Sequence, residues 1–110
     1  MEDIKFELIV CIVNAGFSQN VMDAARAAGA RGGTIIRGRG SANPEAEEFF
    51  NITIQPDKEV VLILVAAGKK DEILSAVYRE NGLATQGAGI AFSLPVERTT
   101  LTMEKATEEE

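Results

Sequence analysis

The order of apolar runs and glycine-rich turns is the feature that most constrains how this chain can fold. Residues 6–38 contain an apolar run, a turn with glycine, a helical pattern, a glycine stop and a short β-branched strand. The same order recurs over residues 59–96. Two successive β-α-β units predict the ferredoxin-like α+β fold, in which a four-stranded antiparallel sheet carries two helices on one face.

The individual elements follow from hydrophobic periodicity and turn residues. The predicted strands are 6–13, 34–36, 51–55, 59–67 and 90–96, and the predicted helices are 18–28 and 69–81. We expect Ser18 to cap the first helix and Gly29 to end it. We expect the second helix to bury Ile73, Leu74, Val77 and Tyr78. The strands 6–13, 34–36 and 59–67 are apolar enough to be predicted as buried.

A sheet with these sequences cannot leave its second face in water. Helices cover only one face in the predicted fold, and strands 6–13 and 59–67 carry few polar residues. Large exposed apolar patches usually mark interfaces. We therefore expect the chain to form a closed cyclic oligomer around that face. Pro95 places the last strand at an edge or a bend.

Composition and charge exclude several functions. The chain of 110 residues has a net charge of −6, which argues against a general nucleic-acid binder. It has no histidine, the commonest general base and metal ligand, and no carboxylate pair at a defined spacing, so we predict no catalytic residues. Its one cysteine, Cys11, lies in an apolar run and is expected to be buried. The apolar runs fall far short of the roughly 20 residues of a membrane span, and the charged N-terminus is no signal peptide. A cytoplasmic protein without membrane insertion is expected.

The stretch from Gly29 to Gly40 concentrates glycine and positive charge. It holds five glycines and three arginines, Arg31, Arg37 and Arg39, in an acidic protein. Such a strand end suggests a small anionic ligand, with phosphate the first candidate. The alternative is a turn, a strand and a loop with solvated arginines. RNA binding through the Arg-Gly-Gly sequence is a weaker alternative, because the chain as a whole is acidic.

Residues 41–55 form a connection that is long for a small domain, and such loops are usually functional or disordered. The candidate partner-binding residues are Asn43, Glu45, Glu47, Phe49 and Phe50. The two phenylalanines are either an anchor onto the domain or a contact for a partner. Glu45, Glu47 and Glu48 could attract a hard cation, but a charge run is usually solvated, so no metal site is predicted. Residues 1–98, with this loop, are expected to form one domain, and 99–110 an acidic tail.

This order of elements resembles the PII signal-transduction proteins and their PII-like relatives over residues 6–96. The resemblance rests on the sequence 29–36, the long loop, the strand 58–65, and the sequence Gly-Ala-Gly-Ile-Ala-Phe at 87–92 followed by Pro95-Val96. It implies a homotrimer that binds adenine nucleotides between subunits. It also implies that a "T-loop", here about 41–55, controls a membrane transporter or a metabolic enzyme, as in nitrogen regulation.

The resemblance also implies a set of ligand-binding residues. Gly32 and Thr34 would lie beside the adenine or ribose, and Leu64 would contact the base. Residues 37–40 would be the root of the T-loop. Residues 87–89 would form the "B-loop", whose backbone N–H groups can face phosphate oxygens. The implied ligand-binding residues are Gly32, Thr34, Arg37, Gly38, Arg39, Gly40, Leu64, Gly87, Ala88, Gly89 and Ile90.

The sequence departs from the nitrogen-sensing members at defined positions. Ile90 stands where they carry a lysine, residues 101–103 where they carry basic residues, and no glutamine marks the T-loop root. Fewer phosphate contacts would suit ADP or AMP better than ATP with magnesium and 2-oxoglutarate. Arg37, Arg39 and Arg98 could supply charge instead. No covalent cofactor is expected. The alternatives are a structural or metal-responsive trimer, or an acylphosphatase-like enzyme whose loop 14–18 would lack the arginine that the reaction needs.

Overall fold

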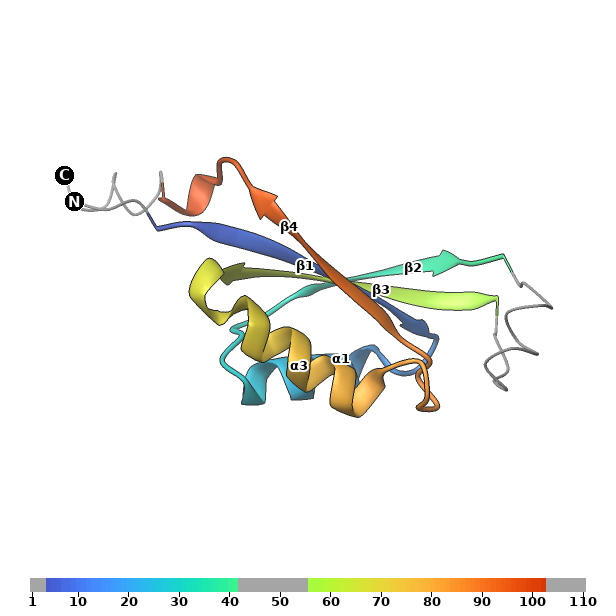
Figure 1. Ribbon diagram of the computed structural model, residues 1–110. Helices are drawn as coiled ribbons and strands as arrows, with labels where there is room; N and C mark the ends of the chain where they lie inside the picture. Colours follow the sequence, from blue (N-terminus) through green and yellow to red (C-terminus); the bar gives the residue numbers. More distant parts are fainter. Residues whose placement is uncertain (1–3, 42–55, 103–110) are drawn as a thin grey trace.

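The computed structural model describes residues 4–41 and 56–102. Its elements are β1 (Phe6–Asn14), α1 (Ser18–Ala27), β2 (Thr34–Arg39), β3 (Asp57–Ala66), the 3-10 helix η1 (Ala67–Lys69), α3 (Lys70–Asn81) and β4 (Ile90–Val96). The four strands form one antiparallel sheet in the order β2-β3-β1-β4. Both helices lie on the same face of that sheet (Figure 1). The ferredoxin-like fold predicted from the sequence is therefore confirmed.

The hydrophobic core lies between the sheet and the two helices. Every second residue of the central strands points into it, because successive side chains of a strand alternate between faces. The core side chains are Ile9, Cys11 and Val13 of β1, Val61, Ile63 and Val65 of β3, Val21, Met22 and Ala25 of α1, and Ile73 and Val77 of α3. The burial predicted for Cys11 is confirmed, and it raises the pKa of the thiol to about 11.

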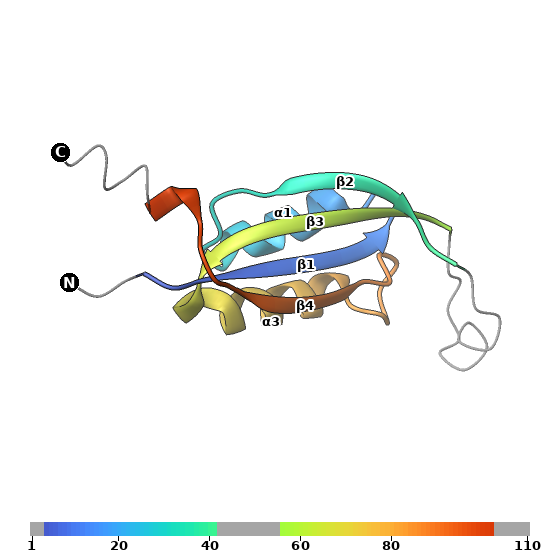
Figure 2. The same cartoon turned by 90° about the horizontal axis from the view of Figure 1, so that it is seen from above.

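The opposite face of the sheet, which we call the helix-free face, is also apolar. The strand register aligns Ile36, Val60, Ile12 and Ile90 in one cross-strand row, and Thr34, Leu62, Val10 and Phe92 in the next. Leu64, Leu8 and Leu94 form a third row. Ile36, Ile90, Phe92 and Leu94 are exposed in the single chain. Seen from above, α1 and α3 lie behind the sheet, and neither covers this side (Figure 2).

Three details of the elements differ from the sequence predictions. Tyr78 is not buried on α3 but 75 % exposed. Among the described strands β2 lies at an edge, paired with β3 alone, and its Ile35 and Ile36 are exposed. It also continues to Arg39, since residues 37–39 pair with residues 57–59 of β3. Lys58 consequently lies within β3, one residue before the predicted start of the strand 59–67.

Other predictions hold or lie outside the described residues. Gly29 ends α1 in the left-handed region, with φ +114°, as predicted. Pro95 lies on β4, which is an edge strand. The predicted strand 51–55, the loop residues Asn43, Glu45, Glu47, Phe49 and Phe50, and most of the acidic tail lie outside the described residues. Of the described helices, none is long and apolar enough to cross a membrane.

Candidate anion-binding site

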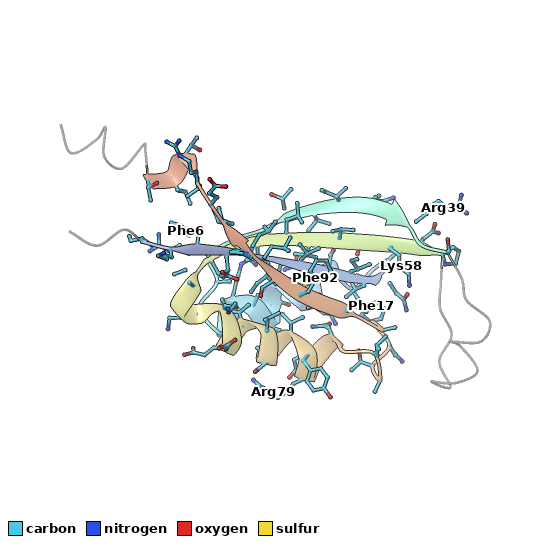
Figure 3. The ribbon with its side chains drawn as sticks, turned by 45° about the horizontal axis from the view of Figure 1, so that its top comes forward. Phe6, Phe17, Arg39, Lys58, Arg79 and Phe92 are labelled. Atoms are coloured by element: carbon cyan, nitrogen blue, oxygen red, sulfur yellow. The ribbon has the colours of Figure 1, made fainter. Side chains whose placement is uncertain are left out.

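Lys58 lies at the end of the sheet where β2 and β1 finish and β3 begins. The register places it between Gly38 of β2 and Asn14 of β1. Its Nζ donates a hydrogen bond to Asn14 Oδ1 at 2.7 Å. Figure 3 shows Lys58 and Arg39 at this end of the sheet, with Phe6 at the opposite end. A cation is thus fixed beside the root of the long loop 41–55.

Asn14 joins this lysine to the glycine-rich turn before β4. Its Nδ2 donates to the Gln86 carbonyl at 3.0 Å, and its backbone N–H donates to the Gly87 carbonyl at 2.9 Å. The root of the loop 41–55 and the turn 86–89, far apart in sequence, therefore meet through one side chain. Neither Asn14 nor Lys58 was a predicted site residue, because their proximity depends on strand register and no local motif marks it.

Gly40 packs against the stem of Lys58. A Cβ at Gly40 would lie 3.3 Å from Lys58 Cε, and the Gly40 N–H donates to the Pro56 carbonyl at 2.7 Å. The ammonium is partly desolvated there, which lowers the pKa of Lys58 from its ordinary 10.5. Desolvation also strengthens the attraction of this charge for an anion.

The predicted B-loop has fewer available donors than expected. The Ala88 N–H donates to the Thr85 carbonyl at 3.0 Å, and the Gly89 N–H donates to the Asn81 carbonyl at 2.8 Å. Among the residues that the structure describes, the Gly87 N–H has no hydrogen-bond acceptor. Of the three predicted donors, Gly87 is thus the one that an anion can use without breaking a bond in the turn.

Packing requires a glycine at only some positions of the predicted site. A Cβ at Gly89 would collide with the Asn81 carbonyl oxygen and lie 2.8 Å from Val13 Cγ1. At Gly87 the nearest atom would be Phe17 Cβ at 3.4 Å, an ordinary contact, and at Gly32 nothing lies within 4 Å. Gly89 is therefore required for packing within the chain. Ala88 has φ +46°, a strained value for a residue with a side chain.

The N-terminus of α1 is already occupied by an internal carboxylate. Glu59 Oε1 accepts hydrogen bonds from the N–H groups of Gly16 at 2.8 Å and Ser18 at 3.1 Å. The predicted cap by Ser18 is therefore wrong: its side chain makes no capping bond, and Glu59 of β3 takes this role from 41 positions away. This carboxylate fills the loop 14–18 that an acylphosphatase-like enzyme would need for its substrate.

Arg37 lies opposite Glu59 across the β2–β3 pair. Partial burial raises the pKa of the Glu59 carboxyl, but the bonds from Gly16 and Ser18 and the charge of Arg37 outweigh it, so the pKa is lowered overall. Arg37 and Arg39 are exposed and point to the helix side of β2, whereas Gly38 shares the helix-free side with Lys58. The positive charge of this sheet end is thus distributed over both faces.

The remaining predicted residues do not all come together within one chain. Gly32 and Thr34 lie at the start of β2, at one edge of the sheet, whereas Gly87–Ile90 lead into β4 at the other edge. Leu64 lies on the helix-free face of β3, paired with Leu8. Gly38 and Gly40, in contrast, lie beside Lys58, and the carbonyls of Gln86 and Gly87 bond Asn14. The candidate site in a single chain consists of this second group.

A pocket of about 310 Å³ lies between α3 and β4, and two predicted ligand-binding residues, Gly89 and Ile90, line it. Its lining includes Cys11, Val77, Asn81 and Ala91, and none of its residues is charged. It does not contain Lys58 or the arginines of β2. Within the described ranges, no three His, Cys, Asp or Glu side chains are grouped so that they could hold a metal ion.

No protein-family profile and no curated protein sequence matches the chain. A candidate PII-like signalling protein of Thermus thermophilus has a TM-score of 0.64 and 18 % identity, over 87 % of this chain and 90 % of that one. Arabidopsis thaliana PII bound to citrate has a TM-score of 0.62 and 26 % identity, over 86 % of this chain and 77 % of that one.

A third structure, a Bacillus cereus protein related to NIF3, has a TM-score of 0.68 and 13 % identity over 89 % of this chain, which spans only 27 % of that protein. The fold and the cationic sheet end define a ferredoxin-like domain with a candidate anion site. The Thermus structure shares the fold of this chain, and the Arabidopsis structure, at 26 % identity, supports a PII-like superfamily relationship. The Bacillus protein carries the same fold within a larger protein, so the site and not the fold must carry the functional argument.

Proposed function

We propose that this chain is a PII-like signalling protein that binds a small anion at the Lys58 end of its sheet. The observation that carries the proposal is the Lys58 ammonium, fixed by Asn14 between the root of the loop 41–55 and the glycine-rich turn 86–89. A ligand that bonds this ammonium changes the charge beside the root of the loop. That change offers a physical route from ligand binding to a partner that contacts the loop.

The proposed assembly is a homotrimer built around the helix-free face. Three apolar cross-strand rows are exposed there in the single chain, and burying them favours association. Association would also bring the β2 edge of one subunit toward the β4 edge of the next. Gly32 and Thr34 could then share a cleft with Gly87 and Ile90, which lie on opposite edges within one chain.

The proposed ligand is ADP or AMP, or another small anion with few charges. The site offers one lysine and one unused B-loop N–H, and Ile90 places no cation after the turn. A carboxylate ligand is a reasonable second class, since Arabidopsis PII was solved with citrate bound. Both classes need charge-assisted hydrogen bonds of the kind that Lys58 provides.

Isothermal titration calorimetry tests the ligand. The purified chain is titrated with ATP, ADP, AMP, cyclic AMP, cyclic di-AMP and citrate, with and without magnesium and 2-oxoglutarate. We expect selective binding of ADP or AMP, reduced at least about tenfold in Lys58→Met, because a charge-assisted bond contributes about 1.5–3 kcal/mol. Equal binding of all the nucleotides, or of none, contradicts the proposal.

The proposed partner is a membrane transporter or a metabolic enzyme that contacts residues 41–55. Deletion of Ser41–Glu48 should abolish partner capture while leaving nucleotide affinity within about threefold of the wild type. Crosslinking through a photoreactive group at Phe50 in the host cell identifies the partner. Capture of the same partner by the deletion variant would remove the loop from the proposed mechanism.

A further inference from the structure

Asn14 occupies a position from which it can organise both halves of the candidate site. We propose that Asn14 is a positioning residue, which holds the Lys58 ammonium in an orientation ready for an anion and joins it to the Gln86 carbonyl of the glycine-rich turn. This inference rests on the proposed function, because it concerns the organisation of that same site. It adds a residue that touches no ligand but determines how the ligand-binding ammonium is held.

The contacts of Asn14 involve both ends of its amide. Its Oδ1 accepts from Lys58 Nζ at 2.7 Å, and its Nδ2 donates to the Gln86 carbonyl at 3.0 Å. The residue is only 2 % exposed, so these bonds replace bonds to water that folding removed. An aspartate could accept from the lysine but not donate to the carbonyl. The side chain is therefore suited to joining a cation to a backbone carbonyl.

The orientation of the turn follows from these bonds. The described chain contains no cis peptide bond, and in a trans peptide the C=O and N–H groups point in opposite directions. Since the Gln86 carbonyl points at Asn14, the N–H of Gly87 in the same peptide points away from β1 and from the Lys58–Asn14 pair, so within one chain it does not face the same anion as the ammonium. That N–H has no acceptor among residues 4–41 and 56–102. The ammonium likewise keeps two donors beyond the one that it gives to Asn14.

The experiment measures how Asn14 acts, not merely whether it matters. ADP and inorganic pyrophosphate are titrated into the wild type, Asn14→Ala, Asn14→Asp, Lys58→Met and the double variant Asn14→Ala/Lys58→Met. We expect Asn14→Ala to weaken both ligands about tenfold. If it acts through Lys58, the same change should weaken them less than about threefold in the Lys58→Met background.

Two further comparisons separate positioning from general stability. Asn81→Ala is the matched control, because Asn81 is equally buried but its side-chain Nδ2 has no hydrogen-bond partner among the described residues. It should leave both affinities within about twofold and the Gly87 amide resonance unshifted. Asn14→Asp keeps the bond to Lys58, so it carries the test if Asn14→Ala does not fold. Its carboxylate offsets the ammonium charge, and we expect about tenfold weaker binding together with a shifted Gly87 amide resonance.

The results that would overturn the proposed function can be told apart from those that would overturn only the role of Asn14. If the wild type binds neither ADP nor pyrophosphate, both the proposed function and this inference fail. If the wild type binds while folded Asn14 variants bind equally well, only the role of Asn14 is overturned. A double variant whose loss equals the product of the two single losses also overturns it, because Asn14 would then act independently of Lys58.

Discussion

At the scale of the residue, Glu59 contributes to stability through a contact made across the sheet. Its carboxylate accepts two backbone N–H bonds at the start of α1. Glu59→Ala should lower the free energy of unfolding by about 1 kcal/mol at pH 7, as loss of a helix cap does. Urea denaturation measures this, with the exposed Glu80→Ala as control. An equal loss in the control would show that the cap contributes nothing specific.

The lowered pKa of Glu59 also predicts how this contribution depends on pH. A carboxyl whose pKa is lower in the folded state stabilises the fold above its unfolded value, 4.5, and loses that contribution as the pH falls through the folded value. The stability difference between the wild type and Glu59→Ala should therefore shrink on acidification below about pH 4.5. Urea denaturation of both proteins between pH 7 and 3 measures it. A stability difference that stays constant over this pH range would contradict a stabilising contact made by the charged Glu59 carboxylate.

Lys58 predicts a pH dependence of the opposite sign, which concerns the affinity for the ligand. Only the charged ammonium attracts an anion, and burial lowers the pKa of Lys58. ADP affinity should fall as the pH rises from 8 to 10, which is a lower pH range than a lysine of ordinary pKa would give. Lys58→Met should remove most of this pH dependence, whereas Lys70→Met should keep it, since Lys70 Nζ lies 3.7 Å from Glu7 Oε1 at the other end of the sheet. Calorimetry over this pH range measures the ADP affinity of the wild type and of both variants. An equal pH dependence in all three would contradict the role of Lys58.

At the scale of the element, the turn 82–89 is held by its packing against β1 and the end of α3. Gly89→Ala should cost about 1–3 kcal/mol of unfolding free energy, because its Cβ would collide with the Asn81 carbonyl and crowd Val13. Gly87→Ala meets only ordinary contacts with Phe17 and should change stability by less than about 0.5 kcal/mol. Thermal unfolding compares the pair. Equal losses would contradict the different roles of these two glycines.

At the scale of the whole molecule, the proposed trimer depends on the helix-free face. Phe92 lies in the middle cross-strand row of that face and is 42 % exposed in the single chain. Phe92→Lys should convert a trimer to a monomer, because a buried interface would have to desolvate the ammonium. Tyr78→Lys replaces an exposed aromatic residue on α3 and should leave the trimer intact. Light scattering after size-exclusion chromatography gives both masses. A monomeric wild type would remove the trimer from the proposal.

The sequence by itself determined the order of elements and the class of fold. Apolar periodicity and glycine stops are local signals, so they located β1, α1, β4 and the end of α1 at Gly29 to within a residue or two. The repeated β-α-β pattern then fixed the antiparallel sheet with both helices on one face. The apolar character of the second face was also readable, because alternation along β1 and β3 leaves hydrophobic residues on both sides.

Only the tertiary structure decided which polar groups meet. Lys58 and Asn14 are separated by 44 positions, and Glu59 and Gly16 by 43. Strand register brings each pair together, and no motif within either segment reveals that register. The same holds for the N–H groups of the turn 86–89: the sequence identified its glycines, but folding determined that Gly89 serves packing and that Gly87 keeps an available donor. Hydrophobic periodicity is a signal among residues close in sequence. A polar site depends instead on side chains brought together by long-range strand pairing.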